Sequence, residues 1–98
     1  MNVTHDLDGA EQRVLAEVVD FAGKRVLEIG CGDGRLTWTF APQASFVLAI
    51  DADDEEIAIA LRERPRELAG KVEVRAESAV ELDVAPASFD LAFLSWSL

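Results

Sequence analysis

The feature that most constrains the fold is a short apolar run that stops abruptly at alternating glycines. Val26, Leu27 and Ile29 carry the aliphatic side chains expected of a strand buried on both faces of a parallel sheet. Gly30, Gly32 and Gly34 follow, and because glycine lacks a Cβ they allow positive φ and close approach of a ligand to the main chain. The apolar and aromatic stretch 36–40 then predicts a helix. Together these segments predict a cradle for a small molecule with anionic or hydrogen-bond-accepting groups.

The spacing of the glycines separates two classes of ligand. In the dinucleotide fingerprint G-x-G-x-x-G, the third glycine would fall at Arg35, whereas this chain has G-x-G-x-G. With Glu28 two residues before the first glycine, residues 28–34, Glu-Ile-Gly-Cys-Gly-Asp-Gly, resemble the first motif of the class I S-adenosylmethionine-dependent methyltransferases. The resemblance continues at Ala49-Ile-Asp51 and at residues 88–94, and so covers essentially the whole chain.

The pattern of elements predicts an α/β fold. Buried strands are expected at 25–29, 45–50 and 89–94, and a strand with one wet face nearer the sheet edge at 71–75. Helices are expected over 9–22, from Gly34 to Ala41, and from a cap at Asp53 or Asp54 with a break around Pro65. Right-handed crossovers then predict a Rossmann-like three-layer α/β/α domain with parallel strand order 3-2-1-4 and a ligand above the carboxyl ends.

The resemblance also implies how much of a methyltransferase is present. We expect one domain over residues 1–98, with a leading helix in 1–23 and a donor-binding core in 24–98. Full-length members of the family have seven strands, so the chain resembles the donor-binding half, truncated before the last three strands. The fourth strand would then be an exposed sheet edge, which invites strand addition. We therefore expect a dimer or a partner chain to cover this edge.

Composition narrows the class of partner. The formal net charge is −10, from 19 acidic and 9 basic residues, and would repel a nucleic-acid backbone. A small-molecule acceptor is therefore expected, and no nucleic acid. No apolar stretch approaches the ~20 residues of a membrane span, and no leader is apparent, so a cytoplasmic protein without membrane contact is expected. The single cysteine, Cys31, excludes an internal disulfide and, without a Cys/His cluster, supports no metal site.

Two acids are the main candidates for donor binding. Asp51 ends the second strand, where an acid accepts hydrogen bonds from both ribose hydroxyls of an adenosine; the alternative is that it only starts a turn. The resemblance implies that Glu28 helps to hold the methionine amino group, directly or through water. The alternative is a solvated carboxylate, or one paired with Arg25 or Arg35, because an unpaired acid is costly to bury.

Further donor contacts follow from the resemblance. It places a polar residue near the adenine amino group after the third strand, and the register leaves Glu77 and Ser78 as alternatives. Ser95 and Trp96 end the fourth strand, the rim where sulfonium and acceptor meet in the family, although core packing explains Trp96 equally well. The predicted cofactor-binding residues are Glu28, Gly30, Cys31, Gly32, Gly34, Asp51, Ala52, Glu77, Ser78 and Ser95.

Other notable residues have structural interpretations. Cys31 is not expected to act as a nucleophile, because the only histidine, His5, is far away in the sequence. Trp38 and Phe40 are expected to pack the second helix on the sheet, and Asp90 is expected to be structural.

The resemblance implies S-adenosylmethionine as cofactor and in-line attack by an acceptor atom on its methyl group. Such a reaction depends on positioning and on exclusion of water more than on acid-base groups, and no catalytic residue is identified. Two alternatives remain open. One is a noncatalytic donor-binding subunit that completes its sheet with another chain. The other is an NAD-binding oxidoreductase fragment, against which Arg35 argues.

Overall fold

The computed structural model describes residues 20–81 and 88–95 of the chain. The helix predicted over 9–22 lies almost entirely outside these residues, as does Trp96. None of the helices in the described ranges has the length and apolar character that crossing a bilayer requires.

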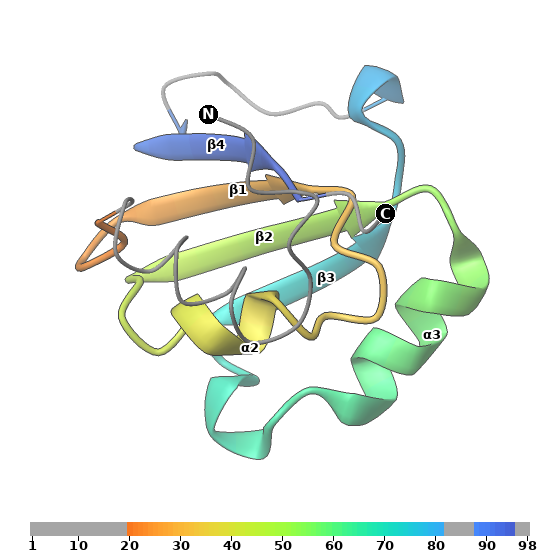
Figure 1. The fold of residues 1–98 in the computed structure, drawn as a ribbon, viewed down its shortest axis with the longest axis horizontal. Helices are drawn as coiled ribbons and strands as arrows, with labels where there is room; N and C mark the ends of the chain where they lie inside the picture. Colours follow the sequence, from red (N-terminus) through yellow and green to blue (C-terminus); the bar gives the residue numbers. More distant parts are fainter. Residues whose placement is uncertain (1–19, 82–87, 96–98) are drawn as a thin grey trace.

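Four parallel strands form one sheet (Figure 1). They are β1 (Arg25–Ile29), β2 (Phe46–Asp51), β3 (Val72–Ala76) and β4 (Leu91–Leu94). Their spatial order is β3-β2-β1-β4, which confirms the predicted topology. The carboxyl ends of all four strands therefore meet at one edge of the sheet, where the loops after β1 and β2 lie beside each other.

β1 lies inside the sheet, with β2 on one side and β4 on the other. Val26 and Leu27 point to opposite faces and are both buried, as the apolar run predicts. In the same register Glu28 stands between Ala49 of β2 and Phe93 of β4. The strand that precedes the glycines is thus held on both sides.

The helices of the described residues, α2 (Thr37–Phe40) and α3 (Asp54–Glu63), pack on one face of the sheet. The core beneath them contains Phe21, Val26, Phe40, Ala41, Val47, Ala49, Ile57, Ala60, Leu68, Val72 and Val74. Leu27, Leu48 and Ile50 form a second cluster on the opposite face. The third layer, predicted to cover that face, is not among the helices of the described residues.

α3 begins where its capping residue predicts. Asp53 accepts hydrogen bonds from the backbone N–H groups of Glu55 (2.9 Å) and Glu56 (3.3 Å), so the first of the two proposed caps is used. The break expected around Pro65 is present: the helix ends at Glu63, and a separate 3-10 turn follows over Arg66–Leu68. Proline disfavours helical φ and ψ in the residue before it and lacks an N–H of its own.

Two predicted elements differ from the structure. α2 begins at Thr37 and not at Gly34, because Gly34 has a φ of 89° and cannot be part of a right-handed helix. β4 is not a buried strand: Ala92 and Leu94 are exposed, because they lie beside Leu27 and Ile29 on the sheet face that no helix of the described residues covers. No strand among the described residues pairs with the outer edge of β4, which agrees with the open edge expected from the resemblance.

Candidate functional site

The loop after β1 contains the three alternating glycines, and all three have positive φ. The values are 85° at Gly30, 58° at Gly32 and 89° at Gly34. A Cβ built on Gly34 would lie 2.7 Å from Cε2 of Trp38, so the indole covers the space that a side chain would need. The glycine pattern is therefore required by the backbone and by the close packing of α2 against the loop.

Hydrogen bonds fasten this loop to the end of β2. The backbone N–H groups of Gly30 and Cys31 donate to the carbonyl oxygen of Ile50, at 2.8 and 3.0 Å. The N–H of Gly32 donates to Oδ2 of Asp51 at 2.9 Å. The loop and Asp51 thus form one unit, although 19 residues separate Gly32 from Asp51 in the chain.

Asp51 is held by two backbone amides and retains capacity to bind a ligand. Besides the Gly32 amide, the N–H of Asp53 donates to Oδ1 at 2.8 Å. A carboxylate offers about four acceptor positions, so about two remain for other donors. The side chain is half-buried at the tip of β2. Asp51 therefore starts a turn. It also lies at the end of β2, where binding of the ribose hydroxyls would require it.

Glu28 is fully buried on the face of the sheet that α2 covers. The hydroxyl of Thr37 donates a hydrogen bond to Oε1, and Oε2 has no hydrogen-bond partner among the described residues. Burial raises the pKa of Glu28 to about 7. Two nearby hydroxyls oppose that rise only in part: that of Thr37, which bonds the carboxyl, and that of Ser95, whose hydrogen bond goes to the carbonyl oxygen of Gly30 instead.

The alternative interpretations of Glu28 are wrong. Arg25 pairs with Asp90 at 3.5 Å, and Arg35 pairs with Asp33 at 3.2 Å. The carboxyl is also fully buried, so solvent does not stabilise its charge. Its partner is a neutral hydroxyl, which compensates a buried carboxylate less than an arginine would.

Cys31 lies inside the loop with its side chain buried. Its Sγ is 3.6 Å from the carbonyl oxygen of Gly32. Burial raises the pKa of the thiol, and the negative charges of Glu28 and Asp51 raise it further. The thiolate needed for nucleophilic attack is therefore disfavoured.

The remaining predicted residues lie at the same edge of the sheet. Ala52 is exposed beside Asp51, and the N–H of Glu77 donates to the backbone oxygen of Asp51 at 2.9 Å. Ser78 follows, half-buried. Ser95 donates its N–H to Ile29 O at 2.9 Å and its hydroxyl to Gly30 O at 3.3 Å. The fold therefore brings all ten predicted residues to the carboxyl ends of the strands, while the choice between Glu77 and Ser78 for adenine stays a prediction.

Residues outside the proposed site take structural positions. Asp90 accepts a hydrogen bond from the backbone N–H of Arg25 at 2.9 Å, which lowers the pKa of its carboxyl and ties β4 to the start of β1. Phe40 is buried and stacks on Phe21, with ring centroids 4.4 Å apart. Trp38 is half-buried against the same core.

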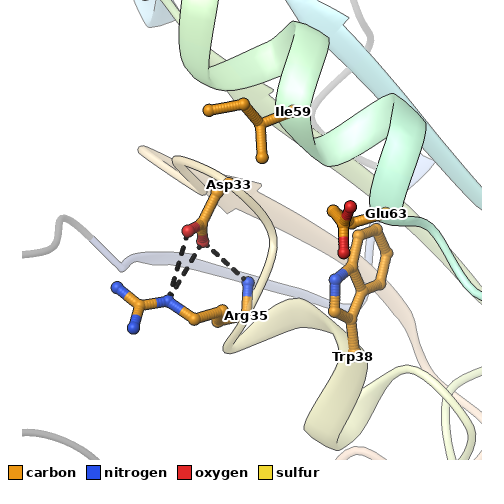
Figure 2. Close-up of a pocket in the computed structure, with 5 residues that line it drawn as sticks. All are labelled: Asp33, Arg35, Trp38, Ile59 and Glu63. Carbon is orange, nitrogen blue, oxygen red and sulfur yellow. Dashed lines mark hydrogen bonds and ion pairs between the residues drawn. The ribbon is translucent and has the colours of Figure 1, made fainter.

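A hollow of about 290 Å³ lies on the other side of the glycine loop, between α2 and α3 (Figure 2). The Asp33–Arg35 ion pair borders it on one side, and Trp38 and Glu63 face it on the other. None of the ten predicted donor-binding residues lines this hollow. It is therefore separate from the predicted site.

Sequence reasoning missed two residues of the site. Thr37 bonds Glu28, and Glu56 of α3 approaches the loop so closely that a Cβ on Gly32 would lie 3.3 Å from its Oε1. The signal for Thr37 was present: a buried strand acid needs a donor, and a hydroxyl follows the last glycine by three residues. No local pattern marks Glu56, because the fold of α3 over the loop creates the contact.

Comparison with known proteins identifies the family. A family model described as "Methyltransferase domain" matches residues 26–98, from β1 to the end of the chain. The chain belongs to the class I S-adenosylmethionine-dependent methyltransferases. The match begins in the strand that leads into the glycine loop, so the part of this methyltransferase domain that carries the site lies within the matched range.

Several known methyltransferases are similar to this chain over part of their own length. Phosphoethanolamine N-methyltransferase 1 of Triticum aestivum is 34% identical over 95% of this chain and 19% of its own. The ubiquinone biosynthesis O-methyltransferase of Azotobacter vinelandii is 36% identical over 89% of this chain and 38% of its own. The structure of Haemonchus contortus phosphoethanolamine N-methyltransferase 1, in complex with phosphoethanolamine and S-adenosylhomocysteine, superposes with a TM-score of 0.79. It is 29% identical over 97% of this chain and 20% of its own.

The methyltransferase domain described here thus spans between about a fifth and two fifths of these relatives.

Proposed function

We propose that this methyltransferase domain binds S-adenosylmethionine at the carboxyl ends of β1 and β2 and serves methyl transfer to a small molecule. The observation that carries the proposal is the 2.9 Å hydrogen bond between the Gly32 amide and Asp51 Oδ2. It fixes the acid beside a glycine loop and leaves carboxylate acceptor positions for the two ribose hydroxyls. Charge-assisted bonds of this kind contribute ~1.5–3 kcal/mol each.

The rest of the donor also finds matching groups. The unpartnered Oε2 of Glu28 is a suitable acceptor for the amino group of the methionine part, directly or through one water. The glycines leave the loop without side chains where the donor would cross it. Glu77, whose N–H donates to the backbone oxygen of Asp51, or Ser78, which follows it in the chain, would face the adenine.

The charge of the site favours a cationic donor over a dinucleotide. Asp51 at the end of β2 and Glu56 of α3 place carboxylates beside the loop, while Asp33 in the loop is paired with Arg35. S-adenosylmethionine carries a sulfonium and an ammonium group, whereas the pyrophosphate of NAD carries negative charge that these acids would repel. The oxidoreductase alternative is therefore not favoured.

A small-molecule acceptor is supported by charge and by the relatives. The net charge of −10 disfavours nucleic acid, and the relatives named above include a phosphoethanolamine N-methyltransferase and a ubiquinone biosynthesis O-methyltransferase. When bound, S-adenosylmethionine supplies an electrophilic methyl group. The residues of the proposed site would bind and orient that donor.

A noncatalytic donor-binding subunit is the second candidate. The open outer edge of β4 in the described sheet favours it, because a second chain could complete the sheet there. Donor binding is common to both candidates, so binding is the first property to test.

The test is a thermal-shift titration of the 98-residue chain with S-adenosylhomocysteine, with NAD as the control ligand. At 100 times its dissociation constant a ligand adds ~2.7 kcal/mol, which raises the melting temperature of a domain this size by on the order of 10–20 °C. We expect a saturable shift with S-adenosylhomocysteine, none with NAD, and none in Asp51→Ala.

Asp54→Ala is the matched control, since Asp54 is an exposed acid in the first turn of α3 outside the site, and it should retain the shift. A cooperative melt that S-adenosylhomocysteine leaves unchanged would contradict the donor site. A shift with NAD would restore the oxidoreductase alternative.

A further inference from the structure

Glu28 is buried in an arrangement that is incomplete without a further donor. One carboxyl oxygen accepts a hydrogen bond from Thr37, and the other has no partner in the described part of the chain. Both side chains are fully buried. A buried polar atom without a partner costs free energy, so its presence indicates a use outside the folding of the domain.

The groups that act on the Glu28 carboxyl in the described ranges are neutral hydroxyls, those of Thr37 on α2 and of Ser95 just after β4. The neighbouring loop adds negative charge: Asp51 and Asp33 act on Cys31, and Glu56 of α3 approaches Gly32. Asp33 is itself paired with Arg35. A cationic ligand would therefore supply the positive charge that the buried carboxyl of Glu28 needs as a partner.

We propose that Thr37 is a positioning residue for the amino group of the donor: its hydroxyl engages Oε1 of Glu28 and thereby leaves Oε2 available to the ligand ammonium. The inference rests on the proposed donor site and adds a residue to it. Thr37 acts through Glu28 and does not itself contact the donor.

The local structure suits Thr37 to this task. Its β-branched side chain has few rotamers in a helix, so the hydroxyl stays directed at the carboxyl. The Trp38 N–H donates to the carbonyl oxygen of Gly34 at 3.0 Å, which ties the start of α2 to the glycine loop. Glu28, Thr37 and the loop are thus held as one unit, and a ligand on the loop would find the carboxyl already oriented.

The test compares two ligands that differ at the amino-acid end. S-adenosylhomocysteine and 5′-methylthioadenosine share adenine, ribose and sulfur, but only the first carries the amino group. Isothermal titration of the full chain should show Thr37→Val weakening S-adenosylhomocysteine about tenfold, the value of one charge-assisted hydrogen bond, with methylthioadenosine unchanged. Thr37→Ser should restore most of the affinity because it keeps the hydroxyl.

Thr39→Val is the matched control. It removes an exposed threonine hydroxyl from the same helix, one that donates to the carbonyl oxygen of Leu36 at 2.6 Å, and both affinities should stay unchanged. If Thr37→Val does not fold, Thr37→Ala removes the hydroxyl without placing a methyl group against the carboxyl.

A double-mutant cycle with Glu28→Gln gives the second readout. If Thr37 acts through Glu28, the Thr37 substitution should have little further effect in a chain that already carries Glu28→Gln. Equal weakening of both ligands, or additive effects in the cycle, would show a merely structural role and overturn the inference. A parent chain that binds methylthioadenosine and S-adenosylhomocysteine equally would also overturn it. Failure of the parent chain to bind either ligand would overturn the donor site itself.

Discussion

At the scale of single residues, the burial of Glu28 makes its protonation part of the folding equilibrium. Its pKa rises from an ordinary value of 4.5 to about 7 because the folded chain removes the carboxyl from water. The folded state therefore binds more protons than the unfolded state between these two pH values. Raising the pH disfavours the state that binds more protons, which here is the folded state. The free energy of unfolding therefore falls as the pH rises through this window.

We predict that Glu28 makes its largest contribution to the free energy of unfolding below about pH 4.5. This contribution is lost as the pH rises to about 7. A shift of this size corresponds to a change of about 3 kcal/mol. Urea denaturation of the parent and of Glu28→Gln at several pH values measures it, since the variant should lack this part of the slope. Glu63→Gln, at an exposed position of α3, should keep the parent slope, and equal slopes in all three proteins would contradict the prediction.

At the scale of elements, the glycine loop and α2 are packed so closely that neither can change alone. Gly34 has a φ of 89° and lies beneath the Trp38 indole, so two separate constraints select glycine there. The positive φ of Gly34 explains why α2 begins only after the loop has turned. The site thus depends on a helix of four residues held by its neighbours.

We predict that Gly34→Ala destabilises the fold by several kcal/mol, because backbone strain of about 1–2 kcal/mol adds to the overlap with Trp38. Gly23→Ala is the matched control: Gly23 also has a positive φ, of 68°, but nothing lies within 4 Å of an added Cβ. Chemical denaturation should therefore show a smaller loss at Gly23. Equal losses at the two positions would mean that the indole contact contributes nothing.

Trp38→Ala in the Gly34→Ala background should recover the part of the loss that is due to overlap.

At the scale of the whole molecule, the two outer strands of the described sheet, β3 and β4, differ in the side chains that they expose. β3 is an edge strand whose exposed Glu73 discourages further pairing, whereas the described part of β4 exposes Leu94. We propose that a second chain covers the β4 edge. The net charge of −10 opposes association over long distances, so an apolar strand edge would be the local attraction that overcomes it.

We predict concentration-dependent dimerisation of the 98-residue chain, measured by sedimentation velocity. Leu94→Lys should shift the equilibrium to the monomer, because a lysine on an edge strand prevents edge-to-edge pairing. Leu61→Lys places the same charge at an exposed leucine of α3, away from the edge, and should leave the dimer intact. A parent chain that stays monomeric at every concentration would exclude self-pairing.

The sequence by itself determined the features that depend on neighbours along the chain. The apolar run of β1, the positive φ of the three glycines and the cap at Asp53 follow from local sterics and hydrogen bonding, as does the end of α3 before Pro65. The position of Asp51 was also predictable, because it directly follows the apolar run of the next strand and so lies at the carboxyl end of β2. Most of the donor site could therefore be located from the sequence.

Only the tertiary structure decided which groups meet across strands and helices. It paired Glu28 with Thr37 and not with an arginine, placed Trp38 over Gly34, and left the outer edge of β4 exposed in the described sheet. Arg25 and Arg35 were equally good partners for Glu28 by sequence. Arg35 is engaged locally, by Asp33 two residues before it. The pairing of Arg25 with Asp90 and the full burial of the carboxyl arise only when β1, β4 and α2 pack together, since burial and long-range contacts are properties of the packed chain.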